Sequence, residues 1–339
     1  MEQLTAGVGT CVAELKELEA KNNVEQVFES KFWQQNCDFT LARDVLLAAA
    51  GSINHQITKF SLVMAKEKTP SEAETLSICQ AIYEPCQQLL AALKVAIFAG
   101  AGFALTKEMI QGGLRIVTNM HELIRLVGVK EFKRVPEFTG RIWDSCNLMQ
   151  NLSKSNLIAT KRIMLQTVAV LNDTIIELDG VLAEQSNKSE EDVHERNVEE
   201  EDDLSFDMDE TMSPLELQQF KQVLALLKMV QAISKKGVIA VNATEAIDGQ
   251  DGFLPWSSRL PILYDDINEV IVDMGADISP PFEAEIILEH IDHVERVGIA
   301  CIQHLKSQPG LANKADLVNG EVAFTKKIQE VRATLRLDE

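Results

Sequence analysis

Apolar residues in this chain recur at the spacing of an α-helix, and this periodicity constrains the fold more than any other feature. Within 157–182 the intervals are three, four or seven residues, through Leu157, Met164, Val168, Leu171, Ile175, Leu178 and Leu182. Such intervals place every member on one face of a helix. Similar stripes occur in 105–127 and 217–230, and no segment shows the sustained alternation of a half-buried strand. The sequence therefore predicts an all-α protein.

Helix-start signals divide the chain into long helices. Thr69-Pro70-Ser71-Glu72 and Ser213-Pro214-Leu215-Glu216 each offer a capping hydroxyl, a proline at the first helical position and a glutamate after it. Pro85 should kink or split the helix that contains it. The predicted helices lie near 3–29, 37–66, 70–99, 104–128, 138–151, 154–184, 214–247, 257–274, 280–307 and 318–336. Helices of this length suit antiparallel bundles with short connections.

The length of 339 residues suggests about two domains. A weak linker, Lys130 to Thr139 with Pro136 inside it, is the candidate boundary between them. We therefore expect an N-terminal bundle over 1–135 and a C-terminal bundle over 136–339.

One acidic segment carries more than half of the net charge of −20. From Glu184 to Glu210 the chain has 13 acidic and two basic residues, a net charge of −11. The segment is also poor in apolar residues, so it buries too little surface to offset the entropy lost on ordering. We predict a long disordered acidic loop over 185–212 that interrupts the C-terminal bundle.

The remaining composition excludes several classes of protein. A chain of net charge −20 repels phosphate, which argues against direct binding of nucleic acid. No run of 18 apolar residues exists, so we expect no membrane span. The six cysteines are scattered without a Cys-x-x-Cys pair and read as core residues of a cytosolic or nuclear protein.

Motifs for catalysis, cofactors and metals are weak. Gly100-Ala101-Gly102 lacks the third glycine and the preceding strand of a dinucleotide-binding loop, which favours a turn between two helices. His290, His293, Cys301 and His304 lie close to one helical face but span too great a length for one ion, unless a second helix adds ligands. We predict no catalytic residue, cofactor or metal site.

Two kinds of residue are candidates for regulation. Asp266, Glu269 and Asp273 follow one another at helical spacing and form either a solvated acidic face or a surface for a partner of complementary charge. Ser189 precedes Glu190-Glu191-Asp192, as acid-directed kinases require, and Ser213-Pro214 suits a proline-directed kinase. Ser213 is also explained as a helix cap, and the two roles can coexist.

Several short motifs occur in an order that resembles the cyclin-D-interacting protein family (GCIP), whose members are also described as maternal Id-like helix-loop-helix proteins. The motifs are Phe32-Trp33, Lys59-Phe60-Ser61, Thr69-Pro70, Trp143-x-x-Cys146-x-x-Met149, Asn156, the acidic stretch that ends Glu201-Asp202-Asp203-Leu204-Ser205-Phe206, Leu224-Ala225-Leu226-Leu227-Lys228, Lys235-Lys236, Pro280-Pro281 and Ile291-Asp292-His293. The resemblance covers roughly 28–306.

The resemblance implies two helical bundles of talin and vinculin type and a non-enzymatic regulator of the cytoplasm and nucleus. Its implied partners are D-type cyclins and helix-loop-helix transcription factors, and its implied effect is restraint of cell-cycle progression and transcription. The candidate partner-binding helix carries Leu217, Phe220, Leu224, Leu227 and Lys228. The residues before that helix are acidic, so pairing with a transcription factor should prevent DNA binding. The alternative is a talin- or vinculin-like helical scaffold or cytoskeletal adaptor.

Overall fold

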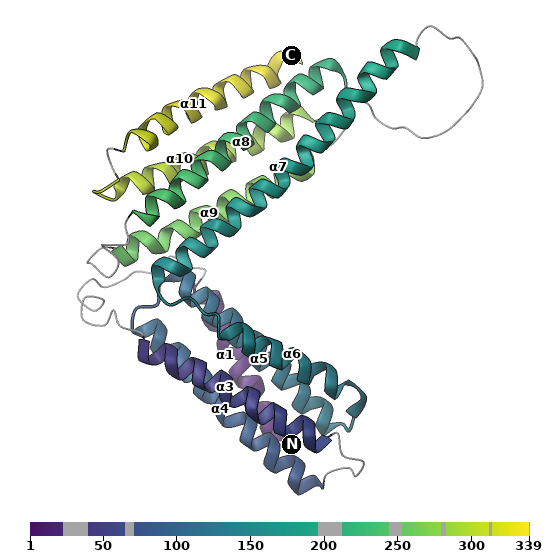
Figure 1. Ribbon diagram of the computed structural model, residues 1–339, viewed down its shortest axis with the longest axis vertical. Coiled ribbons are helices and arrows are strands. Elements are labelled where there is room, and N and C mark those ends of the chain that lie inside the picture. The colour runs from purple at the N-terminus through teal and green to yellow at the C-terminus, as the bar shows by residue number, and fades with distance from the viewer. Residues whose placement is uncertain are drawn as a thin grey trace. The chain divides into compact units, whose positions relative to one another are not determined.

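The computed structural model describes residues 1–22, 40–64, 71–195, 212–243, 253–278, 283–311 and 314–338 (Figure 1). Within these ranges the chain forms ten α-helices, two short 3-10 helices and no strand, which confirms the all-α prediction. The α-helices are α1 (Glu2–Asn22), α3 (Thr40–Met64), α4 (Glu72–Phe98), α5 (Phe103–Gly128), α6 (Val135–Met149), α7 (Asn156–Glu195), α8 (Pro214–Asn242), α9 (Phe253–Asp277), α10 (Ala284–Ser307) and α11 (Ala315–Leu335). None of these helices is long and apolar enough to cross a membrane.

Two helix starts show how local sequence sets the boundaries. Ser213 caps α8 as predicted: its Oγ accepts a hydrogen bond from the Glu216 N–H, and the Glu216 carboxylate accepts one from the Ser213 N–H. For α4 the predicted cap Thr69 is wrong. Ser71 is the cap, because its hydroxyl and the carboxylate of Glu74 form the same reciprocal pair of bonds. Residues 65–70, including Thr69, lie outside the described residues.

Two other expectations need correction. Pro85 does not split α4, which runs unbroken from Glu72 to Phe98 with Pro85 buried, and a kink at this residue stays a prediction. The acidic loop does not begin at 185, because α7 continues to Glu195. Glutamate, glutamine, lysine and alanine favour a helix even in an acidic segment, and the prediction gave charge too much weight. Met212, at the other end of the expected loop, is buried, and its N–H donates to Gln185 Oε1 at 3.0 Å. Residues 196–211 lie outside the described residues.

The chain divides into two compact units, and the division differs from the expected boundary at 135. Unit 1 comprises 1–160 with 247–259, and unit 2 comprises 161–246 with 260–339. The boundary moves because α6 packs against α3 and α5 and so joins the first unit. Unit 1 also pairs α1 with α4 and α5, and α3 with α4. An arrangement of two talin- or vinculin-like bundles stays a prediction.

Unit 2 places α8 against α10 and α11, and α10 against α11. Its core includes the fully buried Tyr264, whose hydroxyl donates to the Ser234 carbonyl at 2.8 Å. Gly298 lets another large ring approach the backbone: a Cβ there would lie 2.6 Å from Phe324 Cζ. The helices of unit 2 therefore meet through aromatic rings set against small residues, as close packing requires.

Candidate interaction surfaces

The apolar residues predicted to meet a partner on α8 are buried in unit 2. Leu217, Phe220, Leu224 and Leu227 are 7%, 0%, 2% and 0% exposed. A partner cannot reach these side chains while α8 keeps its neighbours α10 and α11. Lys228, on the same helix, is exposed, and its Nζ donates to Asp179 Oδ1 of α7 at 2.7 Å.

The predicted acidic face lies on α9. Glu269 and Asp273 are exposed, Asp266 is partly buried, and Val272, between the two exposed acids, is 48% exposed. These side chains present negative charge to solvent, but a cluster of acids does not by itself identify a partner.

The two candidate phosphorylation sites lie in different settings. Ser213 is exposed and serves as the cap of α8, with its Oγ 3.2 Å from the Glu216 N–H. Ser189 lies on α7, and its side chain is outside the described structure. Phosphorylation of either residue stays a prediction.

The residues considered for cofactor chemistry have structural roles. Gly100-Ala101-Gly102 forms a turn between α4 and α5, as predicted, with Gly100 at φ 113°. On α10, His290 Nε2 lies 2.6 Å from Asp277 Oδ2, and Cys301 is buried. Burial raises the pKa of the Cys301 thiol to about 12, so it stays protonated at neutral pH. In the described part of the chain, no three His, Cys, Asp or Glu residues gather as metal ligands.

Asn156 clamps the turn between α4 and α5. Its Nδ2 donates to the Gly100 carbonyl at 2.8 Å, and its Oδ1 accepts from the Gly102 N–H at 2.8 Å. The next residue, Phe103, is held by Asn22 Nδ2 on its carbonyl and by Ser258 Oγ on its N–H, at 3.2 and 3.4 Å. This network fastens the end of α1, the start of α7 and the 253–259 segment to one turn. No local signal marks Asn156 for this role, because both partners lie more than 50 residues away.

A row of polar contacts joins α3 to α6, and we call it the α3–α6 seam. Trp143 Nε1 donates to Thr58 Oγ1 at 3.2 Å, and Asn54 Nδ2 donates to Asn147 Oδ1 at 3.4 Å. Gln150 Nε2 adds a bond to the Leu47 carbonyl at 3.4 Å. All three bonds lie in exposed surroundings. The indole of Trp143 is thus held at the protein surface.

Beneath this seam the same two helices carry the core. Ile53, Ile57 and Phe60 of α3 and Cys146 and Met149 of α6 are buried. The spacing Trp143-x-x-Cys146-x-x-Met149 therefore places two residues in the core and leaves the tryptophan at its edge.

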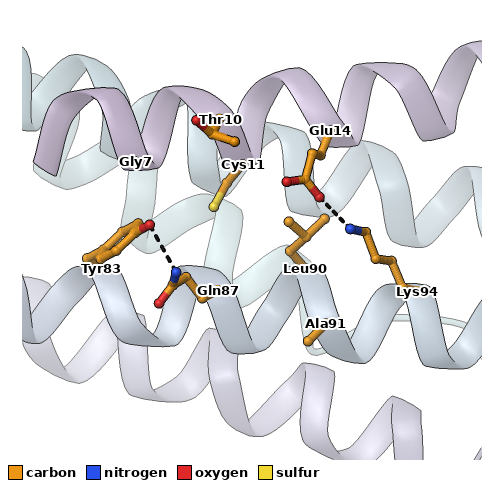
Figure 2. A pocket seen from close by; sticks show the side chains of 9 residues that line it. All are labelled: Gly7, Thr10, Cys11, Glu14, Tyr83, Gln87, Leu90, Ala91 and Lys94. Carbon is orange, nitrogen blue, oxygen red and sulfur yellow. Dashed lines mark hydrogen bonds and ion pairs between the residues drawn. The ribbon is translucent and has the colours of Figure 1, made fainter. Parts of the chain in front are cut away.

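A shallow groove of about 280 Å³ lies between α1 and α4 (Figure 2). Its lining residues are Gly7, Thr10, Cys11, Glu14, Tyr83, Gln87, Leu90, Ala91 and Lys94. At one end Gln87 Nε2 donates to the Tyr83 hydroxyl at 2.9 Å, and at the other end Glu14 and Lys94 form an ion pair. Cys11 is buried, and desolvation, with a smaller contribution from Glu14, raises the pKa of its thiol. Because Tyr83 pairs with Gln87 at one end and Glu14 pairs with Lys94 at the other, the groove offers few polar groups to orient a ligand.

Comparison with known proteins gives these surfaces a context. Residues 45–184 match the family described as Grap2 and cyclin-D-interacting, N-terminal. Over these residues the chain resembles the GCIP family. It is 21% identical over 274 residues to a protein of Homo sapiens named Cyclin-D1-binding protein 1, and 20% identical to the protein of the same name from Bos taurus. Each alignment covers 78% of this chain and 72% of the relative.

The GCIP match contains some of the candidate surfaces and excludes others. Its range of 45–184 includes every residue of the α3–α6 seam and the clamp residue Asn156. The candidate residues on α8 and the acidic face on α9 lie beyond it. The exposed surface of α3 and α6 therefore lies inside the range that the family model matches.

Proposed function

We propose that this protein binds a D-type cyclin as a non-enzymatic partner, acts in the cytoplasm and nucleus, and thereby restrains cell-cycle progression. The observation that carries the proposal is the GCIP match over 45–184, together with similarity to two proteins named for binding cyclin D1.

The docking surface in this proposal is the α3–α6 seam. Tryptophan is enriched among the residues that dominate binding energy, because its ring supplies a large apolar area and its N–H a hydrogen bond. Trp143 meets this description: its ring borders the core, and its N–H is already oriented by Thr58. The polar groups of Asn54 and Asn147 beside it would form the rim of the interface.

The first experiment measures binding between the purified full chain and a purified D-type cyclin, at low salt and at physiological salt. We expect a saturable complex. If a protein with an intact helical spectrum shows no binding at low salt, the proposed function is wrong.

The second experiment tests the docking surface with three variants. Trp143→Ala should weaken binding by about tenfold or more, which corresponds to about 1.4 kcal/mol. Trp143→Phe, which keeps a ring but loses the N–H, should weaken it less. Ile239→Ala, at a 66% exposed position on α8 outside the GCIP match, is the control and should bind normally. If Trp143→Ala folds and binds as tightly as the control, the seam is not the docking surface, although cyclin binding would stand.

Binding of a helix-loop-helix transcription factor through α8 would require a change in the packing of unit 2. Leu217, Phe220, Leu224 and Leu227 would have to leave the core of unit 2 before such a factor could pair with α8. If α8 pairs with such a factor, adding the factor should speed amide hydrogen exchange at α10 and α11, because these helices would lose their contacts with α8. Unchanged exchange in the presence of bound factor would contradict pairing through α8. Cosedimentation with actin filaments would instead favour the alternative, a talin- or vinculin-like adaptor.

A further inference from the structure

Ser71, the residue that caps α4, is followed by acidic side chains at two positions that matter for a kinase. Glu72 and Glu74 occupy the first and third positions after it, a pattern that also follows Ser189. A protein kinase of the acid-directed class recognises such carboxylates through basic residues of its own. The capping box, in contrast, accepts either glutamate or glutamine at the third position. Helix capping and recognition by a kinase therefore make different demands on residue 74.

The whole motif lies open to solvent. Ser71, Glu72, Ala73 and Glu74 are all exposed, and the chain first becomes partly buried at Thr75. Ser71 itself has φ −65° and ψ 159°, an extended backbone conformation outside the helix. The turn that follows is the first turn of α4, and helix ends open at a lower free-energy cost than helix interiors. A kinase can therefore reach the hydroxyl of Ser71 and the carboxylates beside it while the rest of unit 1 stays folded.

Two other residues have a glutamate at the same spacing, but neither is equally accessible. Ser213 precedes Glu216 by three residues, yet Met212, the residue before it, is buried, and the Met212 N–H donates a hydrogen bond to α7. Glu216 is itself partly buried. Thr174 precedes Glu177 in the interior of α7 and is also partly buried. Among these three hydroxyls, the tertiary structure leaves only that of Ser71 in a fully exposed motif.

Phosphorylation would rearrange the first turn of α4. The Ser71 N–H and the Ser71 hydroxyl each donate to Glu74 Oε2 at 2.8 Å, and the Glu74 N–H donates to Ser71 Oγ at 3.2 Å. A phosphate on Oγ removes the hydroxyl donor and adds a charge of about −1.5 to −2 at pH 7. Since this charge lies beside the Glu74 carboxylate, repulsion opposes the bonds that this carboxylate accepts. The modification thus replaces a neutral cap with a charged one at the start of α4.

We propose that Ser71 is the target of an acid-directed protein kinase. In the reaction the γ-phosphoryl group of ATP is transferred to Ser71 Oγ: the bond between the γ-phosphorus and the oxygen of ADP breaks, the Oγ–P bond forms, and the hydroxyl proton passes to a base of the kinase. Phosphoserine and ADP are the products. The exposure of 71–74, the extended backbone at the serine and the acidic residues after it carry the proposal. It is independent of the proposed cyclin binding and is tested without a cyclin.

The first test incubates the folded full chain with a purified acid-directed kinase, ATP and Mg²⁺, and locates the phosphate by mass spectrometry of proteolytic peptides. A synthetic peptide of residues 66–76 serves as the unfolded reference. We expect phosphate on Ser71 in both, and faster modification of Ser71 than of Ser213 in the folded chain. A folded chain in which Ser71 stays unmodified, whether or not the peptide reacts, overturns the proposal. Faster modification of Ser213 would contradict the selection by accessibility on which the proposal rests.

The second test separates recognition by the kinase from helix capping. Glu74→Gln keeps a residue that completes the capping box, so its circular dichroism and urea unfolding should match those of the unaltered chain. The rate of phosphorylation at Ser71 should nevertheless fall by about tenfold or more. Glu84→Gln, at another exposed glutamate of α4, is the matched control and should leave the rate unchanged. If the folded Glu74→Gln chain is phosphorylated at Ser71 as fast as the control, Glu74 does not direct a kinase to this serine and the proposal is wrong.

Discussion

Replacing Asn156 with alanine should destabilise unit 1 by about 2–4 kcal/mol. The side chain makes two hydrogen bonds of 2.8 Å to the backbone of the turn, one to the Gly100 carbonyl and one from the Gly102 N–H. Leaving one buried backbone group without its partner costs about 1–3 kcal/mol, and partial burial here lets water offset some of that cost. For a unit of roughly 170 residues this corresponds to a fall of about 5–10 °C in the unfolding midpoint.

Tryptophan fluorescence during thermal and urea unfolding is a suitable assay. Trp143 and Trp256 lie in unit 1, and the sequence ranges of unit 2 contain no tryptophan, so the signal follows the unit that holds the clamp. Asn54→Ala is the matched control, because that asparagine makes a single exposed bond of 3.4 Å and its loss should cost less than about 0.5 kcal/mol. If Asn156→Ala unfolds at the same midpoint as the control, the two clamp bonds do not stabilise unit 1.

Three further predictions concern unit 2 and are measured on the full chain. Gly298→Ala should lower the free energy of unfolding, measured in urea, by about 1–3 kcal/mol, because the new methyl would lie 2.6 Å from the Phe324 ring. Gly180→Ala, in open space on α7, should raise that free energy by about 0.5–1 kcal/mol. Equal effects of the two substitutions would contradict the close contact at Gly298. Ser213→Ala should cost about 1 kcal/mol in the same assay, and Ser213→Asp should retain the cap. Cys301 should resist thiol reagents near pH 8 until unfolded, as mass spectrometry of its peptide would report, because its pKa of about 12 leaves little thiolate; rapid labelling of the native protein would contradict this.

Sequence reasoning succeeded for features that depend on residues close together in the chain. The apolar stripe through Leu224 predicted a helix over 217–230, and Ser213 was placed correctly as a cap. It failed by two residues at the start of α4, because Thr69 and Ser71 offer similar capping hydroxyls, and only the bond from the Glu74 N–H identifies the cap. Sequence reasoning also ended α7 too early. High charge density indicates disorder only where no contact orders the chain, and here Gln185 accepts a hydrogen bond from the Met212 N–H.

The candidate interaction surfaces were much harder to predict. The sequence placed Phe220 on the helix most suited to a partner, but the tertiary structure buries it completely. Conversely, Trp143 entered only as part of a motif, and its contact with Thr58, 85 residues away, is what orients its ring at the surface. Periodicity identifies a face of a helix but does not say whether that face meets the core or solvent when both sides carry apolar residues, as α7 does.

The sequence by itself therefore determined that this protein is all-α, where most helices lie and how some of them begin, because helical periodicity and capping act over three or four residues. Only the tertiary structure decided that α6 belongs to unit 1, that Asn156 clamps the turn at Gly100, and that Leu165 and Ile176 face solvent. Each of these facts depends on which distant segments come into contact, and that choice is made by the packing of whole helices against one another.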